Sequence, residues 1–128
     1  MGAVVLDAGV VIAWFDADDV HHERARAALH SVREQELRLP ASAYAETLVR
    51  HSVAGSASAA RARIAAAAIQ VDPVGVDTAE AAASIRTSHR ALRLPDALVL
   101  GHAVAIGADV VLTTDRRWKR FSPRVQVV

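Results

Sequence analysis

Short aliphatic runs, separated by longer helical stretches, constrain the fold of this chain more than any other feature of its sequence. The runs are rich in valine, and between them the apolar residues return at helical spacing. They occupy residues 3–6, 37–39, 69–71, 110–113 and 125–128. Parallel strands need crossover connections of about a dozen residues, which are usually helices. The alternation therefore predicts an α/β sandwich with a mostly parallel sheet and the last run at its edge.

The stretches between the runs predict six helices. The expected ranges are about 10–15, 20–32, 40–53, 58–68, 78–89 and 97–106. Asp19 is the expected cap of the second helix and Asp77 or Thr78 of the fifth, whereas Pro95 and Asp96 open the sixth. The sixth helix is apolar on nearly every face, so we expect it to be central and covered on both sides.

The length and the composition fit one soluble domain that spans residues 1–128. Hydrophobic residues make up 52% of the chain, which is enough for a core and excludes a disordered protein. There is no cysteine, which excludes disulfides, thiolate metal sites and cysteine nucleophiles. The longest uncharged apolar stretch, 97–108, is shorter than the ~20 residues that cross a bilayer. Because no basic leader precedes the first run, we expect a cytoplasmic protein with no membrane partner.

Four acidic residues stand at positions that favour a shared chemical role. Asp7 and Asp115 stand at the carboxyl ends of aliphatic runs, and ligands of open α/β sheets bind beyond the carboxyl ends of the strands. Asp7 is also enclosed by apolar sequence, where an unpaired carboxylate is costly. Asp96 opens the central helix, and Glu46 lies on the helix after the second run. Taken singly, Asp96 is equally a cap, Asp115 a turn residue and Glu46 a solvated side chain, so only the set favours a site.

Several carboxylates in one pocket require a cation. Two of them about 4 Å apart repel by roughly 4 kcal/mol at an effective dielectric constant of about 20. A hard divalent ion offsets this repulsion, and a set made of oxygen ligands alone selects Mg²⁺ or Mn²⁺. Such an ion activates water, holds a scissile phosphate and stabilises the leaving oxygen. The four acids therefore indicate metal-dependent cleavage of a phosphodiester.

The sequence around the four acids resembles the acidic motifs of the PIN domain, and the compact length resembles the VapC-type toxin branch of that family. The resemblance runs through nearly the whole chain, in the family's order, and rests on VVLD at 4–7, AE at 45–46, LPDA at 94–97 and LTTD at 112–115. It implies a PIN-like α/β/α sandwich and a Mg²⁺-dependent endoribonuclease, with Mn²⁺ able to substitute. It further implies that the protein is the toxin of a VapBC-type toxin–antitoxin pair and hydrolyses RNA.

The resemblance also assigns roles and partners. The residues that it makes catalytic are Asp7, Glu46, Asp96 and Asp115. The metal ligands that we expect are Asp7, Asp96 and Asp115, with no site for an organic cofactor. The implied partners are an RNA substrate, a small cognate antitoxin protein and a second copy of the chain in a homodimer.

One position departs from the family's pattern. The family often has Ser or Thr two residues after the first Asp, where this chain has Gly9. A hydroxyl that orients metal-bound water is therefore missing from that position. We expect the hydroxyl of Thr113 or Thr114 to take its role.

Apolar side chains near the beginning of the chain are candidates for docking the antitoxin. We expect a short antitoxin helix to cover Trp14, Phe15 and the alanine-rich helix at about 57–68, because small side chains allow close approach. The alternative is that the alanine-rich helix packs inside its own domain. In a chain with 4% aromatic residues, Trp14, Phe15 and Trp118 are expected to be core or partner anchors rather than base-stacking residues.

Basic residues crowd the last stretch of the chain. All of the basic residues except Lys119 are arginines, which favour bidentate phosphate contacts. We expect Arg116, Arg117 and Arg120 to form an RNA-binding lip beside Asp115, with a solvated basic face as the alternative. The net charge of +1 neither requires nor excludes a nucleic acid.

The histidines rank lower as functional candidates. His21 and His22 begin a helix without a matching partner motif, so we expect surface residues rather than metal ligands. His102 lies within the apolar central helix and is expected to be a hydrogen-bonded core or interface residue.

Three other classes of protein share parts of this pattern. A phosphatase of the haloacid dehalogenase type needs a second Asp two positions after the first, where Gly9 stands. A receiver domain needs paired acids after its first strand and a lysine near its last, but Asp7 has no acidic neighbour and Lys119 ends no clear strand. A non-catalytic RNA-binding or interaction module on the same fold stays open as the alternative, although the intact set of four acids favours the nuclease.

Overall fold

The computed structural model describes residues 2–128 and contains one five-stranded sheet in the order β3-β2-β1-β4-β5, with every neighbouring pair parallel. The strands are β1 (Ala3–Leu6), β2 (Glu36–Pro40), β3 (Ile69–Asp72), β4 (Val110–Thr113) and β5 (Val125–Val127). The helices are α1 (Ala8–Phe15), α2 (His22–Ser31), α3 (Ala41–Val53), α4 (Ala57–Ala66), α5 (Val76–Ser88) and α6 (Leu94–Ile106). A short 3₁₀ helix, η1 (Arg116–Arg120), connects β4 to β5. The predicted parallel sheet is confirmed, with β5 at one edge.

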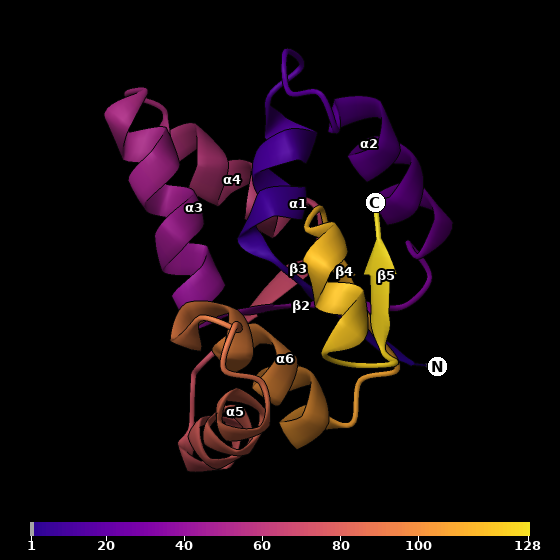
Figure 1. Ribbon diagram of the computed structural model, residues 1–128. Helices are drawn as coiled ribbons and strands as arrows, with labels where there is room; N and C mark the ends of the chain where they lie inside the picture. The colour runs from indigo at the N-terminus through magenta and orange to yellow at the C-terminus, as the bar shows by residue number, and fades with distance from the viewer. Residues whose placement is uncertain (1) are drawn as a thin grey trace.

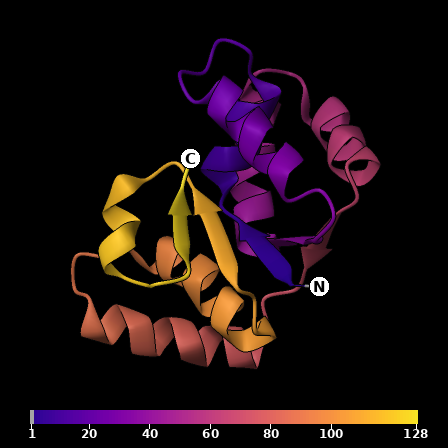
Figure 2. The ribbon, with the colours of Figure 1, turned by 90° about the vertical axis from the view of Figure 1, so that its right-hand side faces the viewer.

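The helices form two layers around the sheet. Figures 1 and 2 show α5 and α6 packed together on one face, with α1 to α4 on the other. The chain steps outward from β1 to β2 and β3, and then returns across the sheet to β4 on the far side of β1. Right-handed crossovers in opposite directions use opposite faces, which gives the α/β/α layering. The reversal leaves a topological switch point between β1 and β4, where ligands of such sheets bind.

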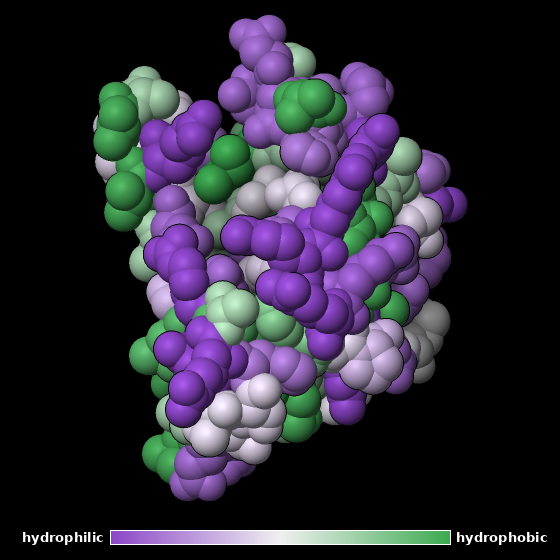
Figure 3. Space-filling model, viewed as in Figure 1, coloured by the Kyte–Doolittle hydropathy of each residue, from purple (hydrophilic) through white to green (hydrophobic). Residues whose placement is uncertain are grey.

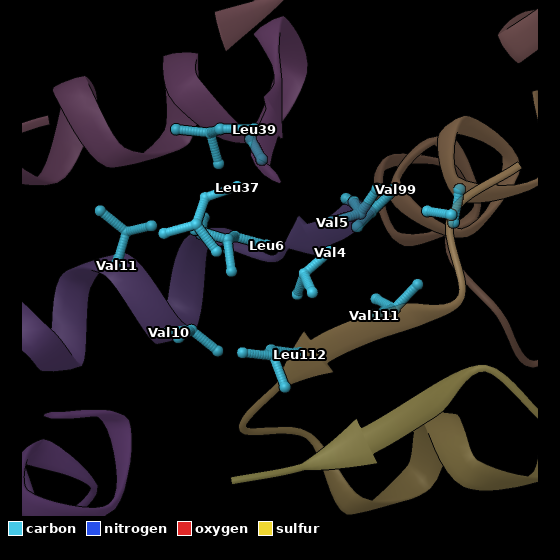
Figure 4. Close-up of a cluster of buried hydrophobic side chains, with 14 of the residues drawn as sticks. Val4, Val5, Leu6, Val10, Val11, Leu37, Leu39, Val99, Val111 and Leu112 are labelled. Atoms are coloured by element: carbon cyan, nitrogen blue, oxygen red, sulfur yellow. The ribbon is translucent and has the colours of Figure 1, made fainter. Parts of the chain in front are cut away.

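The core lies around the two central strands. Val4, Val5 and Leu6 of β1 and Val111 and Leu112 of β4 have no exposed surface. Figure 4 shows aliphatic side chains of α1 on one side of these strands and of α6 on the other. Strands covered on both faces read as continuous apolar runs, which explains why the sequence signal was strong. Each such side chain contributes about 1.5–3 kcal/mol by its burial.

The prediction that the last α-helix is central is confirmed. α6 packs against α5 as well as against β1 and β4, and Ala97, Leu100 and Ala103 are fully or almost fully buried. The contact with α5 is close at Gly101, because a Cβ there would lie 2.6 Å from the backbone nitrogen of Ala82. Only glycine allows the two helices to approach this closely.

Two predicted helix caps are wrong. α2 begins beyond Asp19, whose carboxylate accepts a hydrogen bond of 2.8 Å from the backbone N–H of His21 within the preceding turn. α5 begins before Asp77, so that Asp77 and Thr78 lie in its first turn instead of capping it. The sequence pattern does not distinguish a capping residue from one that accepts a hydrogen bond in the preceding turn, as Asp19 does, or from one in the first turn of the helix, as Asp77 and Thr78 are.

The 3₁₀ helix after β4 was not predicted. Its anchor is Trp118, which is 2% exposed and packs into the core. The side chain of Asp115 caps η1 by accepting a hydrogen bond from the backbone N–H of Arg117. Within residues 2–128, none of the helices combines the length and the apolar character that crossing a bilayer requires.

Candidate active site

The first acid, Asp7, stands where β1 ends and α1 begins. Its Oδ1 accepts a hydrogen bond of 2.8 Å from the backbone N–H of Ala8, so the residue also caps α1. Its Oδ2 accepts one of 2.9 Å from the Thr113 hydroxyl at the end of β4. Asp7 is thus held across the switch point by both central strands, and the capping role accompanies a site role rather than replacing it.

Thr113 connects two of the four acids. Its fully buried hydroxyl donates to Asp7 and accepts a hydrogen bond of 3.1 Å from the backbone N–H of Asp115. The register of β1 and β4, with Leu6 opposite Leu112, brings Asp7 and Asp115 to the same edge of the sheet. The two acids that follow the strands therefore lie at the same edge of the sheet, and their sharing of one site stays a prediction.

The other two acids come from helices on either side of the sheet. Asp96 lies in the first turn of α6 and is partly buried, whereas Glu46 lies on α3 and is exposed. α3 contacts both α1 and α6, so it brings Glu46 toward the end of β1. Asp96 raises the pKa of Glu46, both helix acids raise the pKa of Asp7, and Asp115 raises the pKa of Asp96.

Burial and mutual repulsion raise the pKa of three of the acids. Burial raises the pKa of Asp7 to about 7, with further contributions from Asp96 and Glu46, although hydrogen bonds from Thr113 and the Ala8 N–H oppose the shift. Burial and Asp96 raise the pKa of Glu46. Burial raises the pKa of Asp96 as well, opposed by Arg93 and reinforced by Asp115. A cluster that resists ionisation is one that a cation would stabilise.

The fourth acid behaves differently because an arginine is bound to it. Arg117 donates from Nε to Oδ1 of Asp115 at 3.0 Å and from a terminal nitrogen to Oδ2 at 2.7 Å. These hydrogen bonds hold the pKa of Asp115 below its usual range. The guanidinium is largely exposed, so water screens the pair and its contribution to stability is small.

A small cavity of about 110 Å³ lies beside these groups. We call it the acid cavity; it is lined by Ala91, Leu92, Arg93, Asp96, Asp115, Arg117, Trp118, Arg120 and Phe121. Two carboxylates and three guanidinium groups thus share one wall. Sequence reasoning missed Arg93, whose only signal was its position immediately before the Leu-Pro-Asp-Ala motif.

The donor set suits a hard divalent cation, but no complete cage is present. Within residues 2–128, no three acidic or histidine side chains lie close enough together to hold a metal ion on their own. Among these residues the predicted ligand set is not assembled, and Asp115 is paired with Arg117. Mg²⁺ usually keeps several waters and takes only one or two carboxylates besides substrate phosphate, so an open set of acids is compatible with this ion.

The space beside Gly9, the position that departs from the family's pattern, is filled by the residue that follows β4. A Cβ on Gly9 would lie 2.8 Å from Oγ1 of Thr114 and 3.8 Å from Oδ2 of Asp7. The Thr114 hydroxyl therefore occupies the space beside Asp7 that a side chain at position 9 would need. Glycine at 9 and threonine at 114 are sterically matched.

The predicted basic lip is divided between two faces of η1. Arg117 lies over the acid cavity, and Arg120 lines it while its guanidinium lies 5.0 Å from the centre of the Phe121 ring. Arg116 lines a different cavity, together with Lys119. The three arginines are adjacent in sequence, but they do not form one continuous surface.

A second buried polar cluster lies away from the four acids. His102 contacts Asp72 at 2.8 Å through Nε2 and Thr78 at 2.9 Å through Nδ1, and Arg38 donates to both oxygens of Asp72. Burial raises the pKa of Asp72, but the hydrogen bonds from Arg38 and His102 outweigh it and lower the pKa overall. The prediction of a hydrogen-bonded core histidine is confirmed, because both ring nitrogens of His102 have partners.

His22, Trp14 and Phe15, the remaining predicted side chains, are all partly buried. His22 is partly buried and contacts the carbonyl oxygen of Ala13 at 2.8 Å. Trp14 and Phe15 are partly buried, and the Arg63 guanidinium lies 5.1 Å and 4.3 Å from their ring centres.

The fold and the four acidic motifs define a PIN domain. The family model of the PIN domain matches residues 4–122, and the chain therefore belongs to this family. No curated protein matches the sequence at a significant level.

Solved structures with a similar fold include bacterial toxin–antitoxin proteins. A toxin–antitoxin complex from Klebsiella pneumoniae matches with a TM-score of 0.76 at 21% identity, over 97% of this chain and 96% of that one. VapBC2 from Rickettsia felis, bound to a DNA fragment from its promoter, matches with a TM-score of 0.77 at 14% identity, over 98% and 97%. VapC20 of Mycobacterium tuberculosis, a sarcin–ricin loop cleaving toxin, matches with a TM-score of 0.76 at 19% identity, over 91% and 93%. The predicted PIN-like α/β/α fold is confirmed.

Proposed function

We propose that this protein is a metal-dependent endoribonuclease and the toxin of a VapBC-type toxin–antitoxin pair in the cytoplasm. The observation that carries the proposal is the group of four coupled acids at the switch point of a PIN domain. The similar solved structures support the toxin assignment, because they include a toxin–antitoxin complex and a toxin that cleaves the sarcin–ricin loop.

The residues fit a divalent cation, which we propose to be Mg²⁺ with Mn²⁺ as a substitute. Asp7 and Asp96, with Asp115 once it is released from Arg117, are the carboxylates that would hold it. The ion would supply an activated water and a positive charge for the scissile phosphate. Glu46 is exposed beside these acids and has a raised pKa, so it is suited to accept the proton of the attacking water. Arg117, freed from Asp115, can pair with a phosphate oxygen.

Cleavage of a single-stranded RNA by the purified protein tests the nuclease assignment. We expect cleavage with Mg²⁺ or Mn²⁺, none with excess chelator, and products with 5′-phosphate and 3′-hydroxyl ends. Attack by an activated water needs no neighbouring 2′-hydroxyl, which explains these ends. Cyclic 2′,3′-phosphate ends formed in chelator would point to a different nuclease.

The surface that we propose for the antitoxin lies around α4 and α2. α4 buries only Ala60 and Ile64 and leaves other small side chains exposed, which favours docking over packing within the domain. Beside it lies a cavity of about 550 Å³ that Trp14, Leu29 and Ile69 help to line. An amphipathic helix in such a groove places its apolar residues in the cavity and its charged residues at the rim.

The alternative function is a non-catalytic RNA-binding module on the same fold. Its distinguishing outcome is RNA binding without cleavage in the presence of Mg²⁺ and Mn²⁺. The raised pKa values of Asp7, Glu46 and Asp96 favour the nuclease, because a module that only binds RNA gains nothing from a cluster of acids that resist ionisation.

A further inference from the structure

The side chains of η1 divide its cations into two groups. A 3₁₀ helix has three residues per turn, so side chains three positions apart share a face. Arg117 and Arg120 share the face that lines the acid cavity, whereas Arg116 and Lys119 share another face and line a separate cavity. Trp118 occupies the third face and is buried, which fixes the orientation of the helix. η1 is therefore a basic ridge between two cavities.

The second cavity, which we call the basic cavity, has a volume of about 400 Å³. Its cationic wall combines Arg116 and Lys119 with Arg24, which comes from α2 and is far away in sequence. Val127 and Val128 complete the lining. In Figure 3, strongly hydrophilic side chains gather over the middle of the face where Figure 1 shows η1 in yellow beside β5.

Within the part of the chain that the structure describes, no carboxylate pairs with the three cations of the basic cavity. Within residues 2–128, the side chains of Arg24, Arg116 and Lys119 form neither an ion pair nor a hydrogen bond. Arg117 and Arg38, by contrast, are each paired with a carboxylate. Three exposed cations that converge without a partner repel one another and attract an anion with several oxygens.

We propose that the basic cavity binds a backbone phosphate of the RNA substrate, at a nucleotide away from the scissile bond. The inference rests on the proposed ribonuclease function and extends it. A strand whose scissile phosphate lies at the acid cavity has to cross η1 to reach the basic cavity, and the cations on both faces of the ridge can follow its backbone. Because none of the four acids lines the basic cavity, this contact contributes to RNA affinity and not to the chemical step.

RNA binding at several salt concentrations, measured in chelator so that no cleavage occurs, tests the proposal. The variants are Arg24→Ala and Arg24→Ala/Lys119→Ala; both residues are exposed, so the fold is expected to be unaffected. For the double variant we expect the dependence of log affinity on log salt to become shallower, with the magnitude of the slope smaller by about 0.7. Affinity at about 0.1 M salt should fall about fivefold. The turnover rate at saturating RNA is expected to stay unchanged.

A charge-matched control separates a local contact from a general effect of charge. Arg61→Ala/Arg86→Ala removes two arginines of α4 and α5 that form no ion pair within residues 2–128, and we expect it to leave the salt slope unchanged. A neutral methylphosphonate, placed at one RNA position at a time, identifies the phosphate concerned. At one position away from the cleavage site it should weaken wild-type binding, while the Arg24→Ala/Lys119→Ala variant should no longer respond to it.

The outcomes separate this inference from the nuclease assignment. Altered RNA binding by the double variant, in a protein that does not cleave RNA, would support the basic cavity and contradict the nuclease. Normal cleavage with the same affinity and salt slope in wild type and double variant would overturn the basic cavity alone. The basic cavity would also be overturned, and the nuclease assignment left standing, if binding of inorganic phosphate or duplex DNA depended on Arg24 while binding of single-stranded RNA did not.

Discussion

Thr113 illustrates how the site depends on single residues that carry no charge. Its hydroxyl donates to Asp7 and receives the backbone N–H of Asp115, so one side chain positions two acids. The acids themselves could be predicted, because a carboxylate directly after an apolar run is costly without a function. The sequence could not show that Thr113 would bind Asp7 while Thr114 would lie beside Gly9. That outcome depends on which of the two hydroxyls faces β1 across the sheet.

Thr113→Val should impair the site while preserving the shape of the core. The variant leaves the Asp115 N–H without its partner and removes a hydrogen bond that lowers the pKa of Asp7. We expect the free energy of unfolding to fall by about 1–3 kcal/mol and RNA cleavage to fall with it. Chemical denaturation and cleavage assays measure both effects. Thr113→Ser keeps the hydroxyl and is the control; equal losses in the two variants would mean that the methyl group, not the hydrogen bond, matters.

The raised pKa of Asp7 predicts the direction in which pH changes the stability of the metal-free protein. The folded state binds the proton with a pKa of about 7, compared with 3.8 ordinarily. The folded state therefore holds more protons between these values, and the free energy of unfolding falls as pH rises from about 4 to about 7, by up to a few kcal/mol. Asp7→Asn has no carboxyl to titrate at this position, so it lacks this pH-dependent loss of unfolding free energy. At about pH 8 in chelator the variant should therefore equal or exceed wild type in stability. Parallel stability–pH curves for the two proteins would refute the assignment.

At the scale of secondary-structure elements, the central strands and α6 could be predicted because the two strands are continuous apolar runs and α6 is apolar on nearly every face. η1 could not be predicted. Its five residues include four cations, and only the burial of Trp118 explains why they form an ordered turn. The close packing of α5 and α6 was also invisible, because glycine in an apolar helix looks in sequence like any other small residue.

Gly101→Ala should force α5 and α6 apart. The added Cβ would meet the backbone of Ala82, which cannot move without moving α5. We expect a loss of about 1–3 kcal/mol in unfolding free energy and weaker cleavage, because α6 carries Asp96. Gly75→Ala is the matched control: a Cβ at that position meets nothing within 4 Å, and the expected loss is below about 1 kcal/mol. Similar destabilisation by both substitutions would contradict the close contact.

At the scale of the whole molecule, the sheet order determines where chemistry can occur. The order β3-β2-β1-β4-β5 places the switch point between β1 and β4, the two strands that Asp7 and Asp115 follow. The alternation in the sequence predicted a parallel sheet, and the acids indicated which ends of the strands matter. The partnership of Arg24 with η1 had no sequence signal, because it joins elements that meet only after the chain has folded.

The exposed surface around Trp14 and α4 leads to a prediction about the cell. Expression of this protein alone should slow growth, and co-expression with a cognate small antitoxin gene should restore it and yield a complex that can be purified. Ala62→Glu places a charged, larger side chain on the exposed face of α4 and should weaken the complex without affecting RNA cleavage. Ala79→Glu, on the exposed side of α5, is the control. If the active nuclease is harmless when expressed and binds no such partner, the toxin assignment fails while the nuclease assignment stands.

The central claim is that the four acids form the chemical site, and one comparison tests it most directly. RNA cleavage in Mg²⁺ is measured for wild type and for Asp96→Asn, with thermal unfolding to show that the variant is folded. Asparagine keeps the size of the side chain and removes a charge from a repelling cluster, so the metal-free variant should be at least as stable as wild type. We predict that this folded variant still binds RNA in chelator but does not cleave it in Mg²⁺. Cleavage at the wild-type rate by folded Asp96→Asn would contradict the account.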